Sequence, residues 1–313
     1  MKIASDEMAG LLAKTPPTRT AKSPEQALKV RQVRSGREVA RVNELKGVKA
    51  VAQFGHLRVV ELARCVWPLA RYAEQLARRT VARMVAQGLL LARRNALGSM
   101  SLCLTRGGAS WLDARGIQAQ HTLDLSSVAG STFFHRTLAT RYLIERQVAG
   151  YQVAGEYQIL RRKLPFSIDG LAKALRKLPD GLVWQRKSDG TVAIEIVEQE
   201  AAAKARSELE KCLRAAEYVG TSLSKDGTAK VAGLVFVYDR SLNHARRILL
   251  AANSLWGNRP APERAALEKR VTLVAVAIRP PLVWVSQSIM TLHDFRAQGT
   301  LASRQGSESR KTT

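Results

Sequence analysis

The residues best suited to chemistry are two acids in the second half of the chain. Asp180 follows a proline and opens the apolar run GLVWQR, and Glu195 lies 15 positions later within TVAIEIVEQ. The letters KSDG between the runs are typical of a turn, so we expect a β-hairpin over 181–186 and 191–199. Carboxylates on neighbouring strands can hold Mg²⁺, which polarises a phosphate and lowers the pKa of an attacking water. Asp180 and Glu195 are therefore the candidate metal ligands and catalytic acids of a phosphodiester-cleaving site.

The lysine that such a site needs is missing from its usual place. A lysine two residues after the second acid would normally assist the attacking water, but Val197 stands there. Lys211 on the following helical stretch, or Lys204 before it, could supply the charge in space. We therefore include Lys211 as a catalytic residue only if the hairpin is a nuclease site.

A second interpretation, in which the same acids have structural roles only, stays open. Strict alternation along a strand puts Glu195 on one face and Glu198 on the other, so these two need not converge. Asp180 would then be a turn residue, and Glu198 and Glu200 would favour the N-terminus of the next helix. On this interpretation the domain keeps a nuclease-like fold without activity, which we prefer.

The elements around the hairpin predict a mixed α/β domain over residues 131–298. Apolar patterning gives a helix near 131–150, an extended stretch near 151–160, the hairpin, a helix near 201–218 and a buried strand near 231–239. A helix and further strands follow. This order matches the core of the restriction-endonuclease-like fold.

A second group of candidate functional residues lies in the first half of the chain, where several arginines occur on one predicted helix. The stretch AEQLARRTVARMVAQ is helical in pattern, and Arg78, Arg79 and Arg83 point away from its apolar face. Gly88 is a plausible helix stop. The strand-like runs LLLARR and MSLCLT follow, with a turn between them, and then a short helix. Preceding helical patterns, one of them starting at Pro68, complete the order of a winged helix-turn-helix at residues 46–116.

Such a module would place its third helix in the major groove of duplex DNA. A guanidinium can bind phosphate or the edge of guanine with two hydrogen bonds. We therefore expect DNA contacts from six arginines, namely Arg71, Arg78, Arg79, Arg83, Arg93 and Arg94. The alternatives are a solvated helix face and a winged helix that binds protein.

The charge of the chain favours nucleic acid as the partner. Lys and Arg number 50 against 26 Asp and Glu, a formal net charge of +24. An excess of this size attracts polyanions and releases their counterions. No apolar run is long enough to span a membrane, and the first residues do not resemble a secretory signal. We expect a cytoplasmic protein, associated with the nucleoid or a plasmid, that binds double-stranded DNA and no membrane.

Three segments lack sustained apolar periodicity. Residues 1–45 are predicted to form a disordered basic tail, 117–130 a linker and 299–313 a disordered tail. The three cysteines are scattered without the spacing of a metal site.

The chain as a whole resembles the plasmid "replication-relaxation" proteins, which join a winged helix to a restriction-endonuclease-like domain. The resemblance covers about residues 50–240 and depends on QGLLLARR, SLCLTRGG, His121, the Pro-Asp pair at 179–180, IEIVEQE and the helix ELEKCLRAAEY with Lys211 and Tyr218. It implies a role in replication, mobilisation or their control on a plasmid or integrative element. It carries no catalytic role with it.

The function that we expect is therefore that of a DNA-binding accessory or regulatory protein of a mobile element, without a cofactor. A relaxase or a replication protein and a second copy of the chain are possible partners. The alternatives are a Mg²⁺-dependent endonuclease that uses Asp180 and Glu195, and a repressor of its own operon. No cluster of tyrosine and histidine typical of a relaxase is present.

Overall fold

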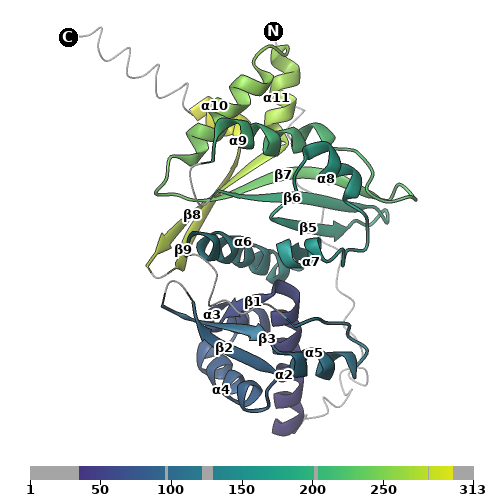
Figure 1. Ribbon diagram of the computed structural model, residues 1–313. Helices are drawn as coiled ribbons and strands as arrows, with labels where there is room; N and C mark the ends of the chain where they lie inside the picture. The colour runs from purple at the N-terminus through teal and green to yellow at the C-terminus, as the bar shows by residue number, and fades with distance from the viewer. Residues whose placement is uncertain (1–34, 96–97, 122–129, 201–203, 281, 299–313) are drawn as a thin grey trace, which may run out of the picture. The chain divides into compact units, whose positions relative to one another are not determined.

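The computed structural model describes residues 35–95, 98–121, 130–200, 204–280 and 282–298. The chain is a mixed α/β protein with two sheets, as expected (Figure 1). The described residues from Ala40 onward belong to one compact unit, which contains both predicted domains. Most of the predicted N-terminal tail and all of the C-terminal one lie outside the described residues.

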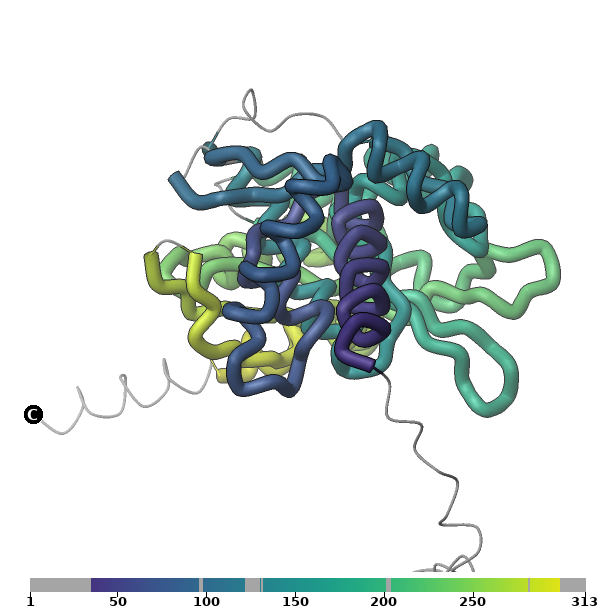
Figure 2. The backbone as a smooth tube through the Cα atoms, turned by 90° about the horizontal axis from the view of Figure 1, so that it is seen from below, coloured from purple at the N-terminus to yellow at the C-terminus, as the bar shows by residue number. Residues whose placement is uncertain are grey.

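The first helix corrects the predicted end of the basic tail. Helix α2 spans Gly36–Phe54 and so begins inside the segment predicted to be disordered up to residue 45. Its apolar face is formed by Val48, Val51 and Phe54, which are buried, while every Lys and Arg of the helix is exposed. Of residues 36–45 only Glu44 is buried, so this part of the helix has no buried apolar stripe from which the sequence could predict it. Figure 2 shows α2 as the purple coil beside the other helices of this half.

The stretch after α2 also differs from the prediction. The apolar residues near Leu57 form a short strand, β1 (His56–Arg58), before helix α3 (Val59–Val66) begins. No helix starts at Pro68, because the chain makes a turn from Trp67 to Tyr72. Pro68 thus follows the end of a helix, whereas the sequence pattern predicts that it begins one, and both uses occur in proteins.

The elements over residues 73–113 agree with the prediction. Helix α4 (Ala73–Ala86) buries Ala77, Val81 and Met84, and Gly88 after it has a φ of +67°, the left-handed conformation that glycine adopts readily. Strands β2 (Leu90–Arg94) and β3 (Met100–Leu104) form the expected antiparallel hairpin, and α5 (Arg106–Asp113) follows. Strand β1 pairs with β3, so the order of this sheet is β1-β3-β2.

The second sheet has six strands in the order β4-β5-β6-β7-β8-β9. The strands are β4 (Gln152–Gly155), β5 (Gly181–Arg186), β6 (Val192–Glu200), β7 (Ala229–Asp239), β8 (Val271–Arg279) and β9 (Val283–Thr291). The predicted hairpin is β5 and β6. Strands β4, β5 and β6 are antiparallel, β6, β7 and β8 are parallel, and β9 returns antiparallel to β8.

Helices cover both faces of this sheet (Figure 1). Helix α6 (Gly130–Val148) lies on one face together with α7 (Glu156–Leu160), and the other helices lie on the opposite face. These are α8 (Asp169–Leu175), α9 (Arg206–Leu213) with the 3₁₀ helix Arg214–Tyr218 after it, α10 (His244–Trp256) and α11 (Ala261–Lys269). Parallel strands that are covered on both faces need apolar side chains on both, which explains the unbroken run VAGLVFVYD in β7.

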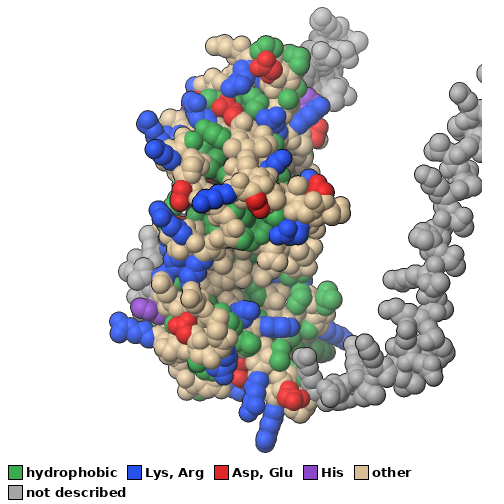
Figure 3. Space-filling view, turned by 90° about the vertical axis from the view of Figure 1, so that its right-hand side faces the viewer, with side chains coloured by type: hydrophobic (Ala, Val, Ile, Leu, Met, Phe, Trp, Pro, Cys, Tyr) green, Lys and Arg blue, Asp and Glu red, His purple; other side chains and the backbone are tan. Residues whose placement is uncertain are grey.

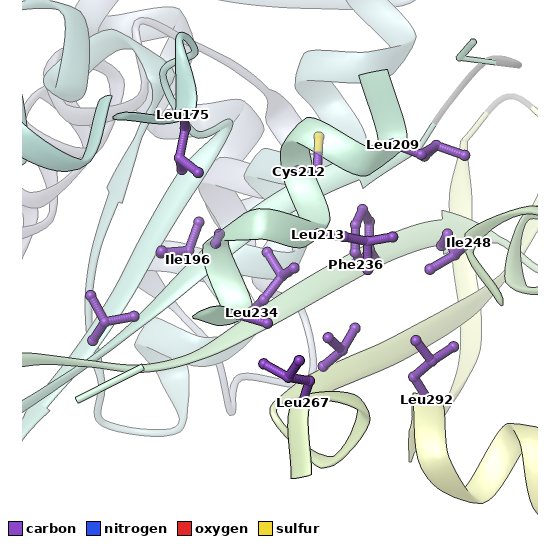
Figure 4. Packing of buried hydrophobic residues seen from close by; sticks show 14 of the residues in the cluster. Leu175, Ile196, Leu209, Cys212, Leu213, Leu234, Phe236, Ile248, Leu267 and Leu292 are labelled. Carbon is purple, nitrogen blue, oxygen red and sulfur yellow. The ribbon is translucent and has the colours of Figure 1, made fainter. Parts of the chain in front are cut away.

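Strand β6 contributes to two hydrophobic cores. Ile194 and Ile196 pack into the core beneath α9, whereas Val197 belongs to the core on the other face. Figure 4 shows Ile196 of β6 and Leu234 and Phe236 of β7 against Leu209, Cys212 and Leu213 of α9. The second core also contains residues of the first half, such as Leu57 and Met84. None of the described helices has the length and apolar character needed to cross a membrane.

Candidate functional site

All three arginines of helix α4 are exposed, but the third also forms an ion pair with a neighbouring helix. Arg79 is exposed, and Arg78 is exposed in an ion pair with Glu74, one turn earlier. Arg83 instead donates from Nε to Oε1 of the buried Glu44 on α2, at 2.8 Å, and also contacts Thr80. Arg83 therefore holds α4 against α2, and Arg79 is the better candidate for contact with a ligand.

The other predicted arginines lie on exposed segments beside this helix. Arg71 lies in the turn before α4, with its guanidinium 5.4 Å from the ring centroid of Tyr72. Arg93 and Arg94 are exposed at the end of β2, next to the tip of the hairpin. Arg94 donates to the carbonyl of Gly98 at 3.2 Å, so it also supports the hairpin.

The exposed face of α4 includes two residues that the sequence analysis did not select. Gln75 and Ala82 are exposed and lie at helical spacing from Arg78 and Arg79. The four residues therefore form one stripe along α4, at positions i, i+3, i+4 and i+7. Helical periodicity could have identified this stripe, because the buried positions of α4 leave it as the opposite face.

The structure does not bring the two predicted metal ligands together. Asp180 precedes Gly181, whose partner on β6 is Val197, whereas Glu195 lies opposite Val183. Three residues along a strand correspond to roughly 10 Å. Each acid also has its own partner: Oε2 of Glu195 lies 3.3 Å from the guanidinium of Arg146.

Asp180 is bound at the end of the sheet. Its Oδ2 accepts a hydrogen bond of 2.8 Å from the backbone N–H of Gln199, and Nε2 of His135 lies 3.3 Å from Oδ1. These contacts join the start of β5 to the end of β6 and to α6. Asp180 therefore has a structural role that the turn interpretation did not include.

Lys211 is not the lysine that approaches the acids. Its side chain is about half-exposed and pairs with Glu208 on its own helix, at 2.5 Å. Lys177 and Lys204 approach the acids at the end of β6 instead. Lys177 pairs with Glu198, and Nζ of Lys204 lies 2.7 Å from Oε1 of Glu200.

We call this group the acid–lysine cluster, and it comprises Asp180, Glu198, Glu200, Lys177 and Lys204. The local backbone explains how it forms. Alternation puts Glu198 and Glu200 on the α9 face of β6, two and four residues after Ile196. Arg176 ends α8 in the left-handed conformation, with φ of 52°, and this turn directs Lys177 toward β6.

Burial and the neighbouring charges together determine the pKa values of the cluster. Burial and the neighbouring charge of Asp180 raise the pKa of Glu198 to about 7, against the opposing effect of Lys177. Burial also raises the pKa of Glu200, and the adjacent acids raise the pKa of Lys177 above its ordinary value despite burial. For Asp180, burial is outweighed by the hydrogen bond from His135 and the charge of Lys177, so its pKa lies well below the ordinary value.

The cluster does not fit a divalent cation. Two ammonium groups take up carboxylate oxygens that a hard cation would need as ligands. Nζ of Lys204 also donates to the carbonyl of Gln199 at 2.9 Å. Among the described residues, no group of three or more His, Cys, Asp or Glu side chains is arranged to hold a metal ion. The arrangement is that of a buried ion-pair network.

The acids of this cluster were visible in the sequence, but their partners were not. Glu198 and Glu200 follow Ile194 and Ile196 at a spacing of two, so alternation alone places all four on one buried face. A buried acid requires a cation nearby. Nothing in the local pattern identifies Lys177, because it precedes β5 in the sequence whereas the acids lie at the end of β6.

Replacement of Lys177 by methionine should strongly destabilise the protein. Glu198 would lose its buried partner, and breaking a buried pair costs roughly 3–5 kcal/mol. The matched control is Lys211→Met, which removes a half-exposed pair worth at most about 1 kcal/mol. Urea unfolding followed by circular dichroism measures both. Equal stabilities for the two variants would contradict the network.

The cluster should also make stability depend on pH. The pKa of Glu198 rises from 4.5 to about 7 on folding, so the folded state binds this proton more tightly. The stability that this proton contributes is complete below pH 4.5 and falls as the pH rises to about 7. Glu198→Gln should therefore show a shallower fall in unfolding free energy across this window. Identical slopes for wild type and variant would show that Glu198 does not titrate there.

Comparison with known proteins gives no relative. No protein-family model matches the chain, and searches of curated proteins and of solved structures found no match. The function must therefore be inferred from the arrangement of the residues themselves.

Proposed function

We propose that the protein is a DNA-binding accessory or regulatory protein whose residues 36–113 form a winged helix that binds duplex DNA through α4. The observation that carries this proposal is the exposed stripe Gln75, Arg78, Arg79 and Ala82. The stripe lies on the second of two consecutive helices, the position of a recognition helix.

The topology of this half supports the winged-helix assignment. A helix, a short strand, two helices and an antiparallel hairpin follow one another as α2, β1, α3, α4 and β2–β3, and β1 closes the sheet beside β3. Gly47 of α2 lies against Met84 of α4 and Leu62 of α3, so the three helices share one core. A hairpin that carries Arg93 and Arg94 near its tip is suited to contact the DNA backbone.

The side chains of the stripe match the edges of bases in the major groove. Arginine binds O6 and N7 of guanine with two hydrogen bonds, and glutamine binds N6 and N7 of adenine in the same way. An alanine methyl group packs against the methyl group of thymine. Arg79 and Gln75 are thus the residues expected to distinguish sequences, and Ala82 leaves room for the groove wall.

The remaining charge suits the phosphate backbone. Lys and Arg side chains are spread over the whole face seen in Figure 3. With a net charge of +24, this distribution favours non-specific binding along a polyanion in addition to any specific site.

The α/β part would then act as a scaffold. Its strand order, with three antiparallel strands followed by parallel ones, is compatible with a restriction-endonuclease-like core. Lysine amines neutralise acids at the position where such a core would use carboxylates for catalysis. We therefore favour an inactive domain that serves DNA binding, in replication or mobilisation of a plasmid or integrative element and with a relaxase or replication protein as partner.

Arg79→Ala should weaken binding to a duplex. The matched control is Arg246→Ala, which removes the same charge from an exposed position on α10. Fluorescence anisotropy over a range of salt concentrations should show affinity reduced about tenfold for Arg79→Ala. If Arg79 contacts a phosphate instead of a base, the slope of log affinity against log salt should fall by about 1. Unchanged affinity and slope would refute the assignment of α4.

Supercoiled plasmid should remain intact when it is incubated with the protein and Mg²⁺ or Mn²⁺. The reason is that Lys177 and Lys204 occupy the carboxylates of the cluster. Nicking would instead support the endonuclease alternative. Loss of nicking in both Asp180→Asn and Glu198→Gln, with activity kept by Glu195→Gln, would then locate the active site at the cluster.

A further inference from the structure

The two edges of the six-stranded sheet differ in how they are protected. Strand β4 at one edge spans only Gln152–Gly155, and the carbonyl of Val153 accepts a hydrogen bond of 3.2 Å from Nε2 of Gln53. Strand β9 at the other edge spans Val283–Thr291, and among the described residues no strand pairs with its outer side. Long, uncovered edges are sites where a further strand can add.

Strand β9 lacks the charges and prolines that commonly prevent a further strand from pairing with an edge, and its one protective feature is a bulge near its start. Its sequence, VWVSQSIMT, contains no charged residue and no proline, although charges and prolines are the common protection of edges. Two apolar β-branched side chains are largely in solvent: Val285 is 59% exposed and Ile289 57% exposed. Val285 is the extra residue of a bulge, because Trp284 and Ser286 pair with consecutive residues of β8.

The order of residues along β9 is complementary to itself. In an antiparallel pair of two β9 strands centred on Gln287, each Gln287 faces the other. Ser286 then faces Ser288, and Val285 faces Ile289. Apolar residues meet apolar ones and polar residues meet polar ones at each of these positions, which is the condition for stable cross-strand pairs.

We propose that β9 is a homodimer interface, at which β9 strands of two copies pair antiparallel about Gln287 and join two six-stranded sheets. The partner is a second copy because the order of residue types about Gln287 is complementary to itself, and the contact carries no charge. Two chains that each carry +24 repel each other, and a surface free of charge is where this repulsion is least. The inference goes beyond the proposed DNA binding and does not depend on it.

The dependence on salt concentration distinguishes dimerisation from DNA binding. Screening reduces the repulsion between two copies, so the dimer should become tighter as salt rises. Affinity for DNA should become weaker over the same range. Sedimentation velocity of the full chain without DNA therefore tests the dimer alone.

We expect wild-type protein to sediment as a concentration-dependent mixture of monomer and dimer. Ile289→Lys places like charges close to the two-fold axis and should weaken dimerisation at least about tenfold. The matched control is Leu250→Lys, at a similarly exposed apolar position on α10, and this variant should dimerise as wild type does. Wild type that stays monomeric at every concentration and salt, or equal dimerisation of the two variants, would overturn the proposal.

A cross-link tests the register independently of affinity. Residues that face each other across antiparallel strands have Cβ atoms about 4.5–5.5 Å apart, close to the spacing in a disulfide. Gln287→Cys should therefore give a covalent dimer under mild oxidation, whereas Leu250→Cys should not. The wild type controls for the native thiols, of which Cys103 and Cys212 are buried. A dimer formed equally by both cysteine variants would refute pairing through β9.

Discussion

Strand β6 is the constraint on which the arrangement of charged groups depends. It lies within the sheet, between β5 and β7, and it is covered on both faces, so its side chains must alternate between two cores. Ile194 and Ile196 fill one core, and the same alternation carries Glu198 and Glu200 into the same buried layer. Glu195 falls on the opposite face, where Arg146 binds it. The separation of the acids is thus a consequence of strand geometry and not of any local preference.

The features that could be predicted from the sequence are those that depend on residues close together along the chain. The hairpin β5–β6 follows from two apolar runs around a turn, and the end of α4 follows from Gly88. Helix α2 was missed in part because its first turns carry more charge than apolar surface, so its pattern resembles a solvated tail. Lys177 could not be found, because its proximity to Glu198 depends on the pairing of β5 with β6 and on the left-handed turn at Arg176.

Internal ion pairs shape the surface as well as the core. Several glutamates are buried, each beside a basic residue: Glu44 with Arg83, Glu61 with Arg58, Glu198 with Lys177, Glu200 with Lys204 and Glu268 with Arg296. Acids placed inside the molecule contribute little negative potential outside it. The exposed surface is therefore more uniformly positive than the composition alone requires, which suits attraction of a polyanion from any direction.

The acid–lysine cluster also constrains the order in which the chain folds. Its members come from the segment before β5, from the end of β6 and from the segment before α9. The hairpin closes a short loop and forms early, whereas parallel pairing of β6 with β7 requires the intervening helix to cross over and is slower. Lys204 follows Glu200 by four residues, so this pair can form locally, but the acids become buried only when α9 covers β6. We therefore expect burial of these acids to join hairpin and crossover into one cooperative unit.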